Sequence, residues 1–192
     1  MRIVSGQFKG HPISAPKTRD TRPTSDRARE SLFNILAHAA YAPDLQGARV
    51  LDLFAGSGAL GLEALSRGAA VCVFIETGRA ARASIQSNIK ALGVSEQVQL
   101  HHRGATDPGS RPAAFEQPFD LVFADPPYGK GLVRPCFEAL QAGDWIGTNT
   151  LLVAETGMKE SLDIPELEVI ADRKIGAARV WFLKPGAKPA SA

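Results

Sequence analysis

The chain has 192 residues, of which 44% are hydrophobic and 22% are charged, and this length and composition fit one globular domain. Its two cysteines, Cys72 and Cys136, are too few for a disulfide framework and lie in no Cys-x-x-Cys or Cys/His cluster. We therefore expect two reduced, buried thiols. No stretch approaches the roughly 20 apolar residues of a membrane span, and the N-terminus has no apolar signal region. These features predict a soluble protein of the cytoplasm.

Positive charge is concentrated at the start of the chain. Residues 1–30 contain seven basic and three acidic side chains, a net charge of +4, whereas the remaining residues contain 15 basic and 17 acidic side chains. A basic segment before a near-neutral body suggests contact with a polyanion. The alternative is a basic segment that is merely solvated. We divide the chain into an N-terminal extension (1–45), a main domain (46–184) and a disordered tail (185–192).

The elements before the main domain are a short hairpin or edge strand and one helix. Residues 3–10 alternate weakly between apolar and polar and contain turn glycines, which favours a hairpin or edge strand. A loop rich in Pro, Thr and Arg follows. Thr24 or Ser25 can then cap a helix, whose apolar positions keep helical spacing at Leu32, Phe33, Leu36 and Ala40.

From residue 49 onward, strand-like and helix-like runs alternate, which is typical of a parallel sheet with helices on its faces. The predicted strands are 49–53, 71–76, 98–102, 119–124 and 151–155, and the predicted helices are 59–67, 79–92 and 135–142. Two further strand-like runs, 167–171 and 178–183, are joined by a short polar segment. They predict an antiparallel pair added to the parallel sheet of an α/β fold.

A glycine-rich turn follows the first predicted strand. Gly56, Gly58 and Gly61 form the G-x-G-x-x-G pattern of a nucleotide-binding turn, and Glu76 ends the next strand, where a carboxylate can accept both hydroxyls of a ribose. These features alone equally suit a nicotinamide-dependent oxidoreductase. Asp52, at the end of the first strand, argues against it, because a carboxylate there repels a pyrophosphate and suits an ammonium group. S-adenosylmethionine has an ammonium group and a ribose but no phosphate.

The predicted strand 119–124 ends in Asp125-Pro126-Pro127-Tyr128. Both prolines have a fixed φ, and Pro127 also keeps Pro126 out of the helical region, so the loop is stiff. Such a loop can hold the Asp125 carboxylate and a backbone carbonyl as two acceptors for one planar NH₂ group, while Tyr128 stacks on the ring that bears it. The motif therefore predicts a site for the amine of a base, with no metal and no covalent intermediate.

With these motifs in this order, the chain resembles the class I S-adenosylmethionine-dependent methyltransferases. The resemblance implies a Rossmann-like fold with a mostly parallel seven-stranded sheet, an antiparallel C-terminal strand pair, helices on both faces and a small N-terminal extension. More narrowly, the chain resembles the bacterial 16S (small-subunit) ribosomal RNA guanine-N2 methyltransferases of the RsmD family. The matching stretches are 2–10, 21–36, 52–68 and 125–132. The stretch from Arg22 to Glu30, located before the glycine turn, narrows the resemblance to this family.

The resemblance implies a role for each motif. The residues expected around the cofactor are Asp52, Phe54, Ala55, Gly56, Ser57, Gly58, Glu76 and Ala105, with Glu76 on the ribose. Asp125, Pro126, Pro127 and Tyr128 are expected to grip the target guanine. The segment from Arg22 to Arg29 is expected to close over the cofactor or to contact RNA. The full set of expected RNA contacts is Arg2, Lys9, Arg22, Thr24, Arg27, Arg29 and Lys130.

One position departs from the family pattern. Such enzymes usually carry an Asp or Asn after the third strand to bind the adenine amine, and Gly104 occupies that place here. Adenine recognition is then expected to use backbone groups or another side chain.

Several other functions fit parts of this pattern. An adenine N6 or cytosine N4 amine in DNA and a glutamine amide in a protein present the same planar NH₂ group. A non-catalytic RNA-binding module with this fold is a further alternative. His101 and His102 alternate on a strand without acidic or cysteine partners, so we expect no metal site. Trp145 and Trp181 are candidate base-stacking residues, although the alternating run around Trp181 is more typical of a core. The expected partner is small-subunit ribosomal RNA, within an assembled or assembling subunit.

Overall fold

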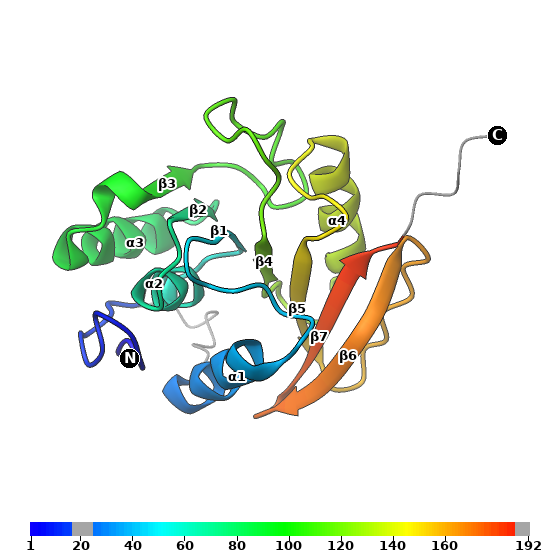
Figure 1. Cartoon of the computed structure of the whole chain (residues 1–192), viewed down its shortest axis with the longest axis horizontal. Coiled ribbons are helices and arrows are strands. Elements are labelled where there is room, and N and C mark those ends of the chain that lie inside the picture. The colour runs from blue at the N-terminus through cyan, green and yellow to red at the C-terminus, as the bar shows by residue number, and fades with distance from the viewer. Residues whose placement is uncertain (17–24, 187–192) are drawn as a thin grey trace.

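The computed structural model describes residues 1–16 and 25–186, which form one seven-stranded sheet with helices on both faces (Figure 1). The strand order is β3-β2-β1-β4-β5-β7-β6. The strands are β1 (Arg49–Leu53), β2 (Val71–Ile75), β3 (Val98–His101), β4 (Leu121–Ala124), β5 (Leu151–Gly157), β6 (Leu167–Ile175) and β7 (Ala178–Pro185). The first five strands are parallel, and β7 is antiparallel to both β5 and β6. This arrangement confirms the predicted fold.

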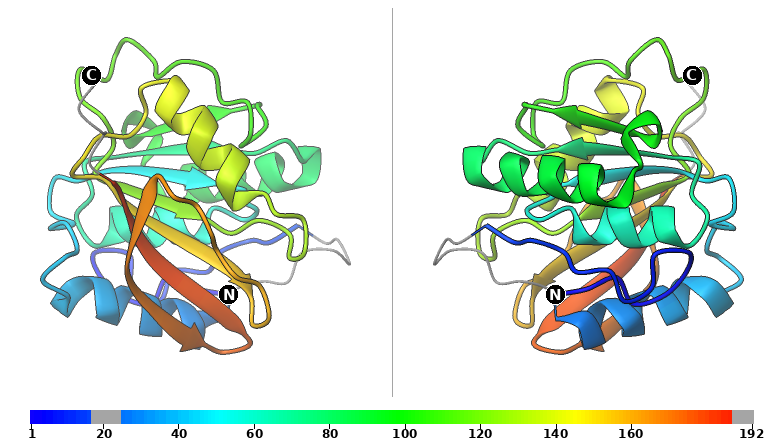
Figure 2. Two further views of the ribbon diagram at one scale, coloured as in Figure 1. Left: turned by 90° about the vertical axis from the view of Figure 1, so that its right-hand side faces the viewer. Right: turned by 90° about the vertical axis from the view of Figure 1, so that its left-hand side faces the viewer.

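Two apolar layers enclose the sheet. The helices are α1 (Asp26–His38), α2 (Ala59–Ser66), α3 (Arg79–Leu92) and α4 (Val133–Ala142), with one short 3₁₀ turn, η1 (Ser95–Gln97). Buried side chains of α1, α2 and α3 share a cluster with one face of the sheet, and those of α4 share a cluster with the other face. Figure 2 shows α1 beside the C-terminal strands β6 and β7. Because both faces are covered, β2 and β4 are continuous apolar runs, and Asp52 interrupts the apolar run of β1.

A local sequence signal explains where α1 begins. Ser25 caps α1, since its side chain accepts a hydrogen bond from the backbone N–H of Ala28 at 3.1 Å. Leu32, Phe33 and Leu36 of this helix are buried, as the helical spacing predicts. The start of α2 has no side-chain cap, and Gly58 precedes it with a φ of 78°.

The C-terminal strand pair is longer than the apolar pattern predicts. β6 continues to Ile175, because residues 171–175 pair with β7. Polar side chains occupy much of this extension, so apolar spacing alone could not reveal it. In contrast, β4 is shorter than predicted. It begins at Leu121 and not at Phe119, because the N–H of Phe119 donates to the carbonyl of Trp145 and not to a neighbouring strand.

The N-terminal segment forms a small loop rather than a strand of the sheet. Its two limbs meet at a single antiparallel bridge, Arg2 with Pro12. Its backbone is held by α2, because the Glu63 carboxylate accepts the N–H groups of Val4 and Ser5 at 2.7 and 3.0 Å. Ile3 and Ile13 belong to the same apolar cluster as α1 and α2.

The cysteine and tryptophan side chains are all buried. Cys72 and Cys136 are both buried free cysteines, as predicted. Trp181 lies in the core at 6% exposure, and Trp145 is also fully buried, so neither ring is available for base stacking. Pro185 completes β7 and Gly186 bonds to Glu166, whereas the rest of the predicted tail lies outside the described residues. Within the described ranges, no helix is long and apolar enough to cross a membrane.

Candidate cofactor and substrate site

The predicted site residues gather at the carboxyl edge of the sheet, where β1 and β4 lie side by side. The helix that follows β1 covers one face of the sheet, whereas the helix that follows β4 covers the other. The two connections therefore leave the sheet toward opposite faces, and the place between them, called the crevice below, is the usual ligand position in an open α/β sheet. Asp52 is the last residue but one of β1, Glu76 follows β2 and Asp125 follows β4.

The turn after β1 has a backbone that requires glycine at more than one point. Phe54, Gly56 and Gly58 all have positive φ values, 55°, 57° and 78°. A Cβ atom at Gly58 would lie 3.3 Å from both Ile85 and Phe74. The turn thus packs its backbone closely on the core.

Asp52 is held in position by the helix that follows the turn. Its side chain is 2% exposed, and its carboxylate accepts the N–H of Gly61 in the first turn of α2 at 2.9 Å. Burial raises the pKa of Asp52 well above its ordinary value, the Gly61 bond opposes this shift, and the charges of Asp125 and Glu76 add to it. Three carboxyl groups therefore converge on the crevice, and a cationic ligand there would favour the ionised form of Asp52.

Glu76 braces the glycine turn. One carboxylate oxygen accepts the N–H of Gly56 at 2.8 Å, and the other accepts the N–H of Gly78 at 2.6 Å. Each oxygen of a carboxylate has two lone pairs, so this brace is compatible with further bonds to ribose hydroxyls. Ribose binding by Glu76 stays a prediction.

The predicted adenine region contains Gly104 and Ala105. Ala105 is buried, and its side chain belongs to the apolar cluster on the α4 face. A Cβ atom at Gly104 would lie 3.9 Å from its nearest neighbours, an ordinary van der Waals distance, so the backbone leaves room for a side chain at this position.

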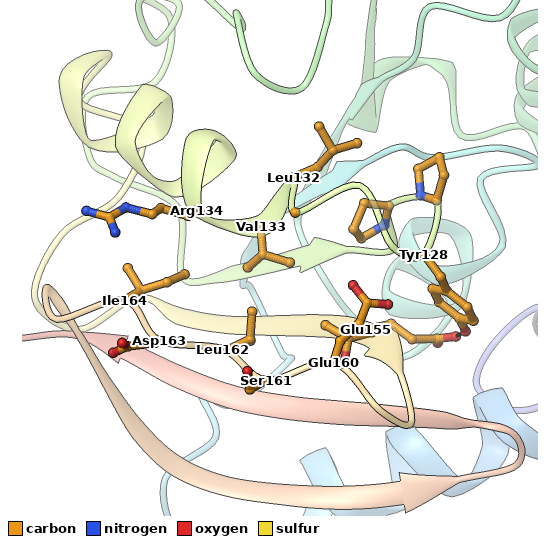
Figure 3. A pocket seen from close by; sticks show the side chains of 14 residues that line it. Tyr128, Leu132, Val133, Arg134, Glu155, Glu160, Ser161, Leu162, Asp163 and Ile164 are labelled. Atoms are coloured by element: carbon orange, nitrogen blue, oxygen red, sulfur yellow. Dashed lines mark hydrogen bonds between the residues drawn. The ribbon is translucent and has the colours of Figure 1, made fainter.

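Pro126, Pro127 and Tyr128 form one wall of a pocket, shown in Figure 3. The opposite wall comes from the end of β5 and from residues 160–164. Tyr128 is 37% exposed, and its hydroxyl donates a hydrogen bond to the Glu155 carboxylate. A smaller pocket next to it is lined by both Asp125 and Glu155, together with apolar side chains.

The sequence did not identify Glu155 as a site residue. It was assigned only as the end of a strand, because nothing local marks it as a ligand-binding residue. The signal is the strand order: β4 pairs with β5 so that Ala124 is opposite Ala154, which places the next residues, Asp125 and Glu155, side by side.

Asn88 was also missed. This buried side chain of α3 donates from Nδ2 to the carbonyls of Ser57 at 3.0 Å and Ser14 at 2.9 Å, and its Oδ1 accepts the N–H of Ser14 at 2.9 Å. It therefore ties the glycine turn to the N-terminal segment. No sequence motif marks such a connection.

The prediction that Arg29 contacts RNA is wrong. Its side chain is fully buried, with Nη2 2.9 Å from the Asp26 carboxylate and Nε 3.5 Å from the buried Glu63 carboxylate. Arg67 lies 2.8 Å from the other oxygen of Glu63. Arg29 thus joins α1 to α2, because helical spacing turns position 29 toward the core together with Leu32 and Phe33.

The other predicted RNA contacts have different positions. Arg2, Lys9, Arg27 and Lys130 are exposed. Arg22 and Thr24 lie outside the described residues. Among the residues with described positions, no group of three or more His, Cys, Asp or Glu side chains has a metal-binding arrangement.

Comparisons with known proteins identify the family of this chain. The family model described as conserved hypothetical protein 95 matches residues 1–184. The chain is 36% identical to "Ribosomal RNA small subunit methyltransferase D" of Escherichia coli over 162 residues, 84% of this chain and 77% of the relative. It is 33% identical to YlbH of Bacillus subtilis over 174 residues, 91% of this chain and 92% of the relative. The solved structure of yhhF from Escherichia coli superposes with a TM-score of 0.78 at 31% identity, covering 98% of this chain and 99% of that one. The chain therefore belongs to the family of conserved hypothetical protein 95, which is the RsmD family that its motifs resemble.

Proposed function

We propose that this protein transfers a methyl group from S-adenosylmethionine to the exocyclic N2 amine of a guanine in 16S ribosomal RNA. The observation that carries the proposal is the meeting of two loops at one sheet edge. The Asp125–Tyr128 loop, suited to a planar amine, adjoins the glycine turn, and the Asp125 charge reaches Asp52 beneath that turn. Relatives named ribosomal RNA small subunit methyltransferase D support methyl transfer to the RNA of the small ribosomal subunit.

The residues at the crevice fit S-adenosylmethionine better than a dinucleotide. The carboxyl groups of Asp52 and Glu76 lie beside the turn, where a cationic ammonium or sulfonium group would favour their ionised forms and a pyrophosphate would be repelled by them. Asp52 and the peptide groups of residues 54–58 would hold the methionine part, and Glu76 the ribose. Backbone groups near Gly104 and Ala105 would meet the adenine. When bound, S-adenosylmethionine supplies the methyl group on a positively charged sulfur.

The Asp125–Tyr128 loop would prepare the base. The lone pair of an exocyclic amine is delocalised into the ring, which makes the nitrogen a weak nucleophile. The Asp125 carboxylate and a backbone carbonyl of the proline pair would accept hydrogen bonds from the two N–H groups and return electron density to nitrogen. The Tyr128 ring would stack on the guanine. Positioning and electrostatics then account for most of the rate enhancement.

The exposed basic residues would bind the RNA around the flipped guanine. We assign phosphate contacts to Arg2, Lys9, Arg27 and Lys130, whose side chains reach solvent. Arg22 and Thr24 belong to the same proposal by resemblance. Residues 1–45 would then serve as the RNA-facing extension of the methyltransferase domain, 46–184. The substrate would be ribosomal RNA in an assembled or assembling small subunit, in the cytoplasm.

The test is a methyl-transfer assay with labelled S-adenosylmethionine and small ribosomal subunits from cells that lack this activity. Nucleoside mass spectrometry then identifies the methylated base. We expect label in N2-methylguanosine. Label in another base or in protein, with none in N2-methylguanosine, would refute the proposed substrate.

Asp125→Ala separates the roles of the two loops. We expect it to abolish transfer while the affinity for S-adenosylmethionine, measured by calorimetry, stays within a few fold of the wild-type value. Equal loss of both would contradict the proposed division between a cofactor loop and a base loop.

A further inference from the structure

We propose that Glu155 is a specificity-determining residue, which selects guanine by accepting the N1–H group next to the N2 amine held by Asp125. This inference rests on the proposed function, methylation at guanine N2, and adds the group that distinguishes guanine from other amine-bearing substrates. Glu155 belongs to none of the motifs in the sequence.

The strand register places the two carboxylates together. β4 and β5 are parallel neighbours with Ala124 opposite Ala154, so Asp125 and Glu155 are the next residues on adjacent strands. Backbones of adjacent strands lie about 4.8 Å apart. Both side chains line one small pocket, whose other walls are mostly apolar. Two acceptors can therefore face adjacent donors on one edge of a planar base.

Glu155 also contacts the loop that grips the base. The Tyr128 hydroxyl donates to its Oε1, so the residue expected to stack on the base also orients this carboxylate, as the two side chains in Figure 3 show. A carboxylate has about four lone-pair sites, and the Tyr128 bond uses one of them. Glu155 lines the larger pocket together with Pro126, Pro127 and Tyr128.

The hydrogen-bonding pattern of the possible substrates explains why a second carboxylate selects guanine. In guanine the N2 amine is adjacent to N1–H, a donor. Next to the amine, adenine has N1, cytosine has N3 and a glutamine amide has its carbonyl oxygen, all of which are acceptors. An ionised carboxylate only accepts hydrogen bonds, so it pairs with guanine and repels the other three. A site built around such a bond strongly rejects analogues that lack the donor.

The experiment compares guanine with 2-aminopurine, which keeps the 2-amino group but has an acceptor at N1. The methylated nucleotide is first located by nuclease digestion of the labelled ribosomal RNA, and small subunits are then reconstituted with RNA that carries either base at that position. The measured quantity is the ratio of methyl-transfer rates, guanine over 2-aminopurine, which cancels any loss of folded enzyme or cofactor binding. We expect the wild-type protein to prefer guanine by at least tenfold.

Glu155→Gln should reduce this ratio by tenfold or more. A glutamine amide can donate to N1 of 2-aminopurine, so transfer to the analogue should hold or rise while transfer to guanine falls. Glu160→Gln is the matched control, because Glu160 lines the same larger pocket but its carboxylate accepts the N–H of Gly157 at 2.8 Å. We expect this control to leave the ratio unchanged.

The outcomes distinguish the inference from the function on which it rests. If the wild-type protein forms N2-methylguanosine but Glu155→Gln keeps the wild-type ratio, the role of Glu155 is refuted and the proposed function stands. A wild-type protein that methylates both bases equally would also refute it. If the wild-type protein forms no N2-methylguanosine, both proposals fail.

Discussion

Gly61 is the third glycine of the turn, and we expect its replacement by alanine to destabilise the protein. Its φ is not in the left-handed region, so helix propensity alone predicts that alanine would stabilise α2 by about 1 kcal/mol. However, a Cβ atom there would lie 2.4 Å from Sγ of Cys72 and 2.4 Å from Cε1 of Phe74. Both residues are fully buried in β2, between two other strands.

The magnitude follows from the two opposing effects. Overpacking a well-packed core costs about 1–3 kcal/mol, and two contacts of this closeness in a central strand favour the upper end. Subtracting the gain of about 1 kcal/mol in helix propensity leaves a net loss of about 2 kcal/mol. For a protein of this length, that loss lowers the Tm by about 4–8 °C.

Urea and thermal unfolding, followed by circular dichroism, measure the change. Gly104→Ala is the matched control, because the new Cβ atom would meet nothing closer than 3.9 Å, and we expect a change within about 0.5 kcal/mol. Adding Cys72→Ala to Gly61→Ala removes one clash, so the double variant should be more stable than the sum of the single effects predicts. A Gly61→Ala protein with the wild-type Tm, or a higher one, would refute the packing role of this glycine.

Four further predictions concern charges and thiols. Glu63→Ala should lower the free energy of unfolding, measured by urea unfolding, by about 3–5 kcal/mol, because it removes a buried partner of the fully buried Arg29. A loss below about 1 kcal/mol would contradict this expectation. Arg27→Gln should reduce the slope of log K against log salt for RNA binding by about 0.7–0.9, whereas an unchanged slope would exclude a phosphate contact. Asp52→Asn should raise the stability of the cofactor-free protein at pH 7 and weaken S-adenosylmethionine binding roughly tenfold or more. Burial raises the pKa of Asp52, so ionisation of its side chain opposes folding. The contribution of Asp52 to the free energy of unfolding is therefore complete below about pH 4 and is lost as pH rises through the raised pKa. The Asn variant should lack this decline. Cys136, with a pKa raised to about 12 by burial, should resist iodoacetamide at pH 8 until the protein unfolds, as intact mass would show.

The sequence by itself determined the order and type of the main elements. Continuous apolar runs identify β2 and β4, because strands covered on both faces bury side chains of both faces in the core; the run of β1 is interrupted by the site residue Asp52. The glycine turn and the Asp125–Tyr128 loop were also evident, because glycine and proline constrain the backbone through their own covalent structure. These signals are local, so no knowledge of the fold was needed to find them.

The tertiary structure decided which charged residues face the site and which are buried. Arg27 and Arg29 have the same chemistry two residues apart, yet Arg29 packs inside, because Glu63 of another helix lies against it. Glu155 joins the site only because β5 is placed beside β4. In each case the deciding partner is distant in sequence. Burial of a charge depends on such a partner, whereas backbone conformation at glycine and proline does not.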